Sequence, residues 1–158
     1  CVLETGYGRG PHENYIDRKA SAFMGNYSAK VNEMKFDYGR PQENGYRTQT
    51  KQLSVTDQDG FGLQFMGLPE FSFAVHNNTT DDYDDGAWKN SRFKDALGNP
   101  KNSHLNDIKP RDLLNLNIDY RQMGVGGDNS WGAKPHDQYL IWPKDYTYSF
   151  TIQPIIIE

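Results

Sequence analysis

Apolar and polar residues alternate along several short stretches of the chain, and each stretch predicts a β-strand with one apolar face. The clearest are residues 114–121, where leucine, isoleucine and tyrosine alternate with polar residues, and residues 146–153, where aromatic residues alternate with threonine and serine. Residues 46–55 predict a third two-faced strand, and the Asp-Gln-Asp-Gly sequence at 57–60 predicts the turn that follows it.

Two further strands are predicted after this turn, one around Leu63 and Phe65 and one over residues 71–75. Gly67 and Pro69 lie between them, and both residue types interrupt regular strands. Together with the strand before the turn, these two strands predict an antiparallel meander.

The remaining stretches carry weaker signals. The first forty residues show little periodicity, apart from a predicted helical turn near residues 31–34. Residues 77–102 are polar and predict a long loop with one helical turn ahead of His104. Long leucine- or alanine-rich periodic stretches are missing, so the expected fold class is all-β with antiparallel strands.

The composition agrees with an all-β fold and excludes some classes of binding partner. The 158 residues are enough for one domain with a core, and 10 tyrosines and 15 glycines favour strands joined by turns. The net charge is −4 and the 17 basic residues are scattered, so neither nucleic acid nor a membrane surface is an expected partner. The single cysteine excludes an internal disulfide. Because the first residue is Cys1 and not Met, we expect a longer parent protein, whose compartment, cytoplasmic or periplasmic, stays open.

The most informative motif is the Met-Gly-Val-Gly-Gly-Asp-Asn-Ser-Trp sequence at residues 123–131, called here the glycine loop. Its glycines permit backbone conformations and close approaches that other residues do not. The residues of interest are Gly124, Gly126, Gly127, Asp128, Asn129 and Trp131. An exposed indole stacks well on the flat C–H face of a sugar, while carboxylate and amide groups bind its hydroxyls. The other interpretation, an indole packed under its own loop, is equally compatible with the spacing.

Other candidate motifs favour structural roles. Charged residues crowd the loop at residues 9–18, where arginine–carboxylate hydrogen bonds are expected to pin the loop rather than to bind a ligand. Residues 41–45 contain the Asn-Gly pair of a tight turn. The aspartates at 81–85 lack the spacing of a calcium loop, and the four histidines lack the spacing of a metal site. The sequence therefore assigns no catalytic residue and no metal ligand.

Three motifs read together carry a family resemblance. They are the Gly-Arg-Gly-Pro-His-Glu-Asn-Tyr-Ile-Asp-Arg sequence at 8–18, the Pro-Gln-Glu-Asn-Gly sequence at 41–45 and the glycine loop. Their order and spacing resemble the C-terminal domain, or small chain, of lac-type β-galactosidases of glycoside hydrolase family 2. The resemblance runs from about Tyr7 to the last predicted strand and departs at residues 84–102, where a loop insertion is expected.

The resemblance implies that residues 1–158 are one domain, the C-terminal portion of a large antiparallel β-supersandwich similar to galactose mutarotases. It implies that the parent hydrolyses terminal β-D-galactose with retention, using two glutamates on a separate TIM barrel. The 158-residue piece is therefore expected to be inactive, with Glu13 and Glu43 as loop fasteners and not as a catalytic pair.

The resemblance also implies a role for the glycine loop. In the family this loop reaches the mouth of the barrel and its tryptophan stacks on substrate sugar, a role that carries over to Trp131. The magnesium and sodium sites of the family lie in other domains, so no cofactor is expected here. The expected partners are a β-galactoside sugar, the TIM barrel and other domains of the parent, and further copies of the parent in a homo-oligomer.

Two alternatives from other classes remain open. A free-standing carbohydrate-binding module would use the same indole on a β-sandwich without a partner domain. A purely architectural domain would bury Trp131 at an interface instead. Sugar binding by the isolated chain distinguishes the first alternative, and shielding of the indole in the parent distinguishes the second.

Overall fold

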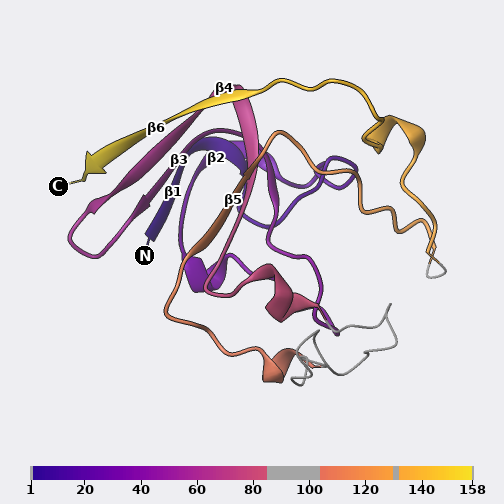
Figure 1. Cartoon of the computed structure of the whole chain (residues 1–158), viewed down its shortest axis with the longest axis horizontal. Helices are drawn as coiled ribbons and strands as arrows, with labels where there is room; N and C mark the ends of the chain where they lie inside the picture. The colour runs from indigo at the N-terminus through magenta and orange to yellow at the C-terminus, as the bar shows by residue number, and fades with distance from the viewer. Residues whose placement is uncertain (1, 85–103, 130–131, 158) are drawn as a thin grey trace.

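The computed structural model describes residues 2–84, 104–129 and 132–157, and over these residues the chain forms one six-stranded antiparallel sheet. The sheet has the strand order β2-β1-β3-β4-β5, and β6 pairs with the first half of β4 (Figure 1). The strands are β1 (Val2–Gly10), β2 (Phe23–Lys30), β3 (Arg47–Thr56), β4 (Phe61–His76), β5 (Asn115–Asp119) and β6 (Ser149–Ile156). The expected all-β class with antiparallel strands is therefore confirmed.

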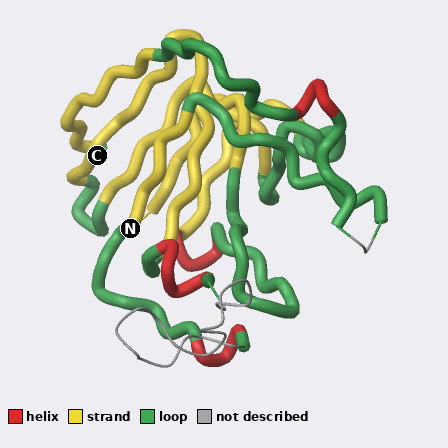
Figure 2. Tube along the Cα trace, turned by 45° about the vertical axis from the view of Figure 1, so that its right-hand side comes forward, coloured by secondary structure: helices red, strands yellow, loops and turns green. Residues whose placement is uncertain are grey.

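The helical structure of the described residues is limited to four single turns in the loops (Figure 2). They are η1 (Val31–Glu33), η2 (Thr80–Tyr83), η3 (Leu105–Asp107) and η4 (Asp137–Tyr139). The predicted turn near residues 31–34 is η1, which begins where the Glu33 carboxylate accepts a hydrogen bond from the Lys30 amide. The predicted loop insertion at 84–102 lies, from residue 85 on, outside the described residues.

The two strands predicted between residues 61 and 76 are one continuous strand, β4. Phe65, before the interruption at Gly67 and Pro69, and Phe71, after it, belong to the same core cluster and so face the same side of the sheet. A Cβ at Gly67 would lie 2.5 Å from the Cα of Glu70, so the backbone folds tightly on itself there without leaving the sheet. Glycine therefore marks a local kink, and not the end of the strand as predicted.

The first two strands were not predicted, because glycines occupy the positions at which an apolar row would show. Gly10 on β1 and Gly25 on β2 both lie under the ring of Tyr27, and a Cβ at Gly10 would lie 2.8 Å from that ring. One aromatic ring thus covers two glycines, and the alternation is lost from the sequence. The last strand also begins later than predicted, since Tyr146 and Tyr148 precede β6 and pack on Tyr120.

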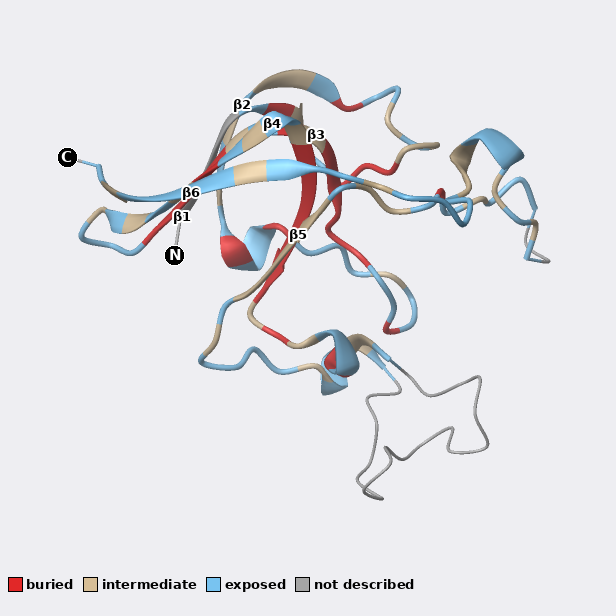
Figure 3. Cartoon of the chain, turned by 45° about the horizontal axis from the view of Figure 1, so that its top comes forward, coloured by how far each residue is buried: buried red, intermediate tan, exposed pale blue. Residues whose placement is uncertain are grey.

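The core lies on the apolar face of β3 and β4, where η1 covers it (Figure 3). Its buried members are Val31, Met34, Leu53, Val55, Phe65, Phe71, Phe73 and Val75. A second, smaller cluster joins the long loops to the sheet, with Tyr15 stacked on Tyr46 at 5.7 Å between ring centroids. This second cluster fixes the loops on which the candidate site depends.

Candidate functional site

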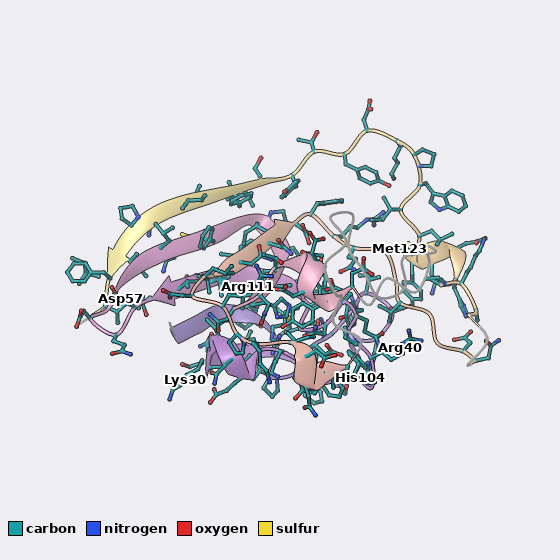
Figure 4. All side chains as sticks on the ribbon, turned by 60° about the horizontal axis from the view of Figure 1, so that its bottom comes forward. Lys30, Arg40, Asp57, His104, Arg111 and Met123 are labelled. Atoms are coloured by element: carbon teal, nitrogen blue, oxygen red, sulfur yellow. The ribbon has the colours of Figure 1, made fainter. Side chains whose placement is uncertain are left out.

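The glycine loop follows β5 and extends away from the sheet, and the chain returns through η4 toward β6 (Figure 1). Met123, where the loop begins, lies at the opposite end of the molecule from Asp57 in the β3–β4 turn (Figure 4). Trp131 lies outside the described residues, so its predicted stacking role stays a prediction. Residues 123–129 of the loop are described, and their contacts follow.

Hydrogen bonds join the two limbs of the glycine loop. His136 Nε2 lies 2.6 Å from Asp128 Oδ2, and the Ala133 amide donates to Asn129 Oδ1 at 3.3 Å. The hydrogen bond and charge of Asp128 raise the pKa of His136 above its ordinary value. Asp128 and Asn129, predicted to bind sugar hydroxyls, are both exposed and both accept a hydrogen bond within the loop.

The three glycines of the loop meet three different requirements. Gly124 is buried, and a Cβ there would overlap with Asp17 Oδ2. Gly126 has φ +69°, and a Cβ there would lie 2.6 Å from the Ala133 carbonyl oxygen. Gly127 has φ +102° with open space around it, so only its backbone conformation favours glycine.

Asp17 is the residue at this site that sequence reasoning missed. Its Oδ1 accepts a hydrogen bond from the Val125 amide at 3.1 Å, and its Oδ2 accepts one from the Gly126 amide at 2.9 Å. More than a hundred residues separate the partners in sequence. The sequence does contain both halves of this contact, an aspartate in the first motif and glycines in the third. Nothing local in the sequence indicates that the two motifs meet.

The loop that carries Asp17 is pinned as predicted, although mainly to backbone groups. Arg9 donates to the Ala22 carbonyl at 2.8 Å and to the side chain of Gln49 at 2.6 Å. Glu13 is buried, accepts from the Gly45 amide at 2.8 Å and from the Tyr38 hydroxyl, and lies 3.6 Å from Arg18. Glu13 is therefore a loop fastener, as expected.

The buried guanidinium of Arg47 ties three loop segments together. It donates to the carbonyls of Pro11, Met34 and Gly45 at 3.0, 3.1 and 2.6 Å. Burial lowers the pKa of Arg47 to about 10, and Glu13 opposes this shift. One side chain thus donates to three carbonyl groups from three segments.

Glu43 differs from Glu13. The residue is exposed as a whole, yet the protein around its carboxyl group, with Asp119 and Glu13 nearby, raises its pKa to about 7. It borders a cleft of about 410 Å³ that His76, Tyr83 and Asn117 also line. None of the hydrogen bonds between described residues involves its side chain, so the expected fastening role of Glu43 stays a prediction.

A second cleft, of about 390 Å³, opens beside the base of the glycine loop. Its lining includes the rings of Tyr120 and Tyr148, the side chain of Glu70, and Ile16 and Gln122 next to the loop contact. Aromatic faces combined with polar groups suit sugar binding. Trp142, which follows η4, is 54% exposed and so is not packed beneath a loop.

The described residues hold no group of three or more histidine, cysteine, aspartate or glutamate side chains placed to bind a metal ion. His76 is buried, bonded to the Asn44 carbonyl and in contact with the Tyr83 ring. No helix in the described ranges has the length and apolar character needed to cross a membrane.

Comparison with known proteins gives one consistent family. The family described as beta galactosidase small chain matches residues 5–152. Proteins named beta-galactosidase are 35% identical over 153 residues in Priestia megaterium, 36% over 147 in Vibrio cholerae and 32% over 151 in Streptococcus thermophilus. These alignments cover 93 to 96% of this chain but only 12 to 13% of each relative.

Proposed function

Because this chain belongs to the β-galactosidase small-chain family, we propose that it is a domain of a longer β-galactosidase that hydrolyses terminal β-D-galactose. The family match over residues 5–152 carries the proposal. Retaining hydrolysis requires two carboxyl groups about 5 Å apart on either side of the glycosidic bond. Glu13 is buried and accepts a hydrogen bond from the Gly45 amide in another loop, which supports placing the catalytic glutamates outside this chain, on a separate barrel. The isolated chain is then inactive.

The domain completes the substrate site through the glycine loop, with Trp131 stacking on sugar and Asp128 and Asn129 meeting its hydroxyls. Three features support this role: the loop projects from the sheet, its limbs are joined, and an aromatic and polar cleft borders its base. Stacking on the incoming sugar is shared by the bound substrate and the transition state. Binding of that kind lowers KM more than it raises kcat.

The test is Trp131→Ala in the full-length protein that contains this chain, with lactose as substrate. KM is expected to rise by about tenfold, equivalent to about 1.4 kcal/mol of stacking, with a smaller loss in kcat. Trp142→Ala is the matched control, since it removes an exposed indole elsewhere in the chain. An unchanged KM for Trp131→Ala contradicts the proposed role of the loop.

A fluorescence titration separates this proposal from its alternatives. The isolated chain is expected to give no saturable response to galactose or lactose, because the barrel must complete the site. A saturable response lost in Trp131→Phe would favour a free-standing carbohydrate-binding module. The proposal also places the magnesium and sodium of the enzyme in other domains and takes the parent to be a homo-oligomer.

A further inference from the structure

Both oxygens of the Asp17 carboxylate accept hydrogen bonds from the glycine loop. Its two oxygens accept from two consecutive amides, Val125 at 3.1 Å and Gly126 at 2.9 Å. Two successive backbone N–H groups thus converge on one carboxylate, an arrangement typical of a concave site for an anion. Hydrogen bonds to an ionised acceptor are about twice as strong as neutral ones.

The residue that makes this contact is held rigidly by the body of the domain. Asp17 lies in a two-residue turn closed by reciprocal hydrogen bonds between Tyr15 and Arg18, at 3.1 and 2.9 Å. Tyr15 is buried and stacked on Tyr46. Next to it, the buried amide of Asn14 accepts from both the amide and the hydroxyl of Thr48 on β3. These contacts fix the position of the Asp17 backbone relative to the sheet.

The glycine loop is shaped to receive this carboxylate. A Cβ at Gly124 would overlap with Asp17 Oδ2 and would lie 3.0 Å from the Cβ of Tyr139. The Gly124 amide donates to the Tyr139 carbonyl at 2.9 Å, so the outgoing and returning limbs meet beside Asp17. The Asp17 carboxylate can therefore reach the loop amides only because residue 124 has no side chain.

Beyond this base, the bonds of Asp128 with His136 and of Asn129 with Ala133 join the loop to itself. Such bonds fix the shape of the tip, whereas its direction relative to the sheet is set at the base. A small rotation about residues 124–126 is multiplied along the limbs, and displacements of about 1 Å suffice to lower activity strongly.

We propose that Asp17 is a positioning residue, which aims the glycine loop at the substrate by holding the amides of Val125 and Gly126. This inference rests on the proposed function of the loop. Asp17 touches no reacting atom and acts through the loop that carries Trp131. Its loss misplaces a binding surface, so KM rises while kcat changes less.

The experiment uses the full-length protein that contains this chain, with lactose as substrate. Asp17→Asn keeps the size of the side chain but turns one acceptor into an NH₂ group that faces an amide. We expect KM to rise by about tenfold and kcat to change by less than about threefold. Gly124→Ala disturbs the same contact from the other side, and a similar rise in KM is expected.

The matched control is Asp57→Ala. Asp57 also accepts from two backbone amides in a turn, Asp59 at 2.9 Å and Phe61 at 3.0 Å, at the opposite end of the molecule from Met123 (Figure 4). Both bonds go to Oδ1, an acceptor that asparagine would keep, so alanine is needed to remove them. This substitution is expected to lower the thermal unfolding midpoint while leaving KM unchanged. A rise in KM for Asp57→Ala equal to that of Asp17→Asn would overturn the inference, since both would then act through general stability.

A double-mutant cycle with Trp131→Ala separates the inference from the proposed function. If Asp17 acts through the loop, Asp17→Asn adds nothing to the KM of Trp131→Ala. Additive effects, or an unchanged KM in Asp17→Asn and Gly124→Ala beside a raised KM in Trp131→Ala, would overturn the positioning role alone. An unchanged KM in Trp131→Ala would overturn the proposed function of the loop and this inference with it.

Discussion

The two halves of β4 carry the same sequence pattern but are packed very differently. Odd-numbered residues form one apolar row along the strand, yet Phe71 and Phe73 are 1% and 0% exposed while Phe61 and Leu63 are 56% and 45% exposed (Figure 3). The covered half, residues 71–76, packs against η1 and pairs with β5 in the sheet. The open half, residues 61–64, pairs with β6, whose Ile152 and Ile156 are exposed as well. Alternation thus sets the face of a residue, and only a covering element makes that face a core.

The comparison also explains where the candidate site lies. The polar loops that hold Asp17 pack on the covered half, through Arg47, which pairs with Phe73, and through the buried Asn14. A positioning contact requires a rigid support, and the covered half provides one. Asp57, in the turn before the open half, lies at the opposite end of the molecule from Met123, where the glycine loop begins (Figure 4).

The largest expected effect on stability comes from a substitution in the covered half. Phe73→Ala removes a fully buried ring and should lower the free energy of unfolding of the chain by about 3–5 kcal/mol. Leu63→Ala in the open half should cost less than about 1 kcal/mol, because its side chain keeps much of its contact with water. Urea denaturation of the two variants measures both values. Equal losses would show that the two halves are equally packed.

A second measurement sharpens the same comparison. In the longer protein, a much greater loss for Leu63→Ala than in the 158-residue chain would show that another segment covers the open half there. An equally small loss in both settings would mean that this face is a true surface.

The next effect tests the polar support of the covered half. Arg47→Met keeps the length of the side chain but leaves three carbonyl groups without their donor, and we expect a loss of about 2–4 kcal/mol. Lys51→Met on the same strand is the control, since Lys51 is exposed. Thermal unfolding checks both variants. A loss no larger than that of the control would mean that water replaces the guanidinium.

Alternation predicted the covered half well and the site only in part. β3, β5 and the turn at 57–60 were predicted because their apolar rows and turn residues are local signals. β1 and β2 were missed because glycines interrupt their apolar alternation. The ring of Tyr27 on β2 covers Gly25 on its own strand and Gly10 on the neighbouring strand. The glycine loop was recognised from its motif, whereas Asp17 was not. A contact between residues 17 and 126 depends on the fold and leaves no local periodicity to detect.

A smaller effect depends on pH. The pKa of Glu43 is raised from 4.5 to about 7 by the protein around its carboxyl group and by Asp119 and Glu13. The folded state therefore binds the proton more tightly than the unfolded state, and stability falls as pH rises from 4.5 to about 7. The Glu43→Gln variant lacks this loss of stability. The difference between its thermal unfolding midpoint and that of the unsubstituted chain should therefore increase as pH rises over that interval. A difference that stays constant with pH would contradict the shifted pKa.

The smallest expected effect concerns the tip of the glycine loop, far from both halves of β4. Asp128 raises the pKa of His136, so their ion pair is complete below the ordinary histidine pKa of 6.5 and is lost as pH rises through the raised value. Asp128→Asn should lower the pKa of His136 toward 6.5 in an NMR titration of its ring protons, with Asp59→Asn as a control in the distant turn. Both residues are exposed, so global stability should hardly change. An unchanged His136 pKa in Asp128→Asn would mean that the limbs of the loop are not joined by this pair.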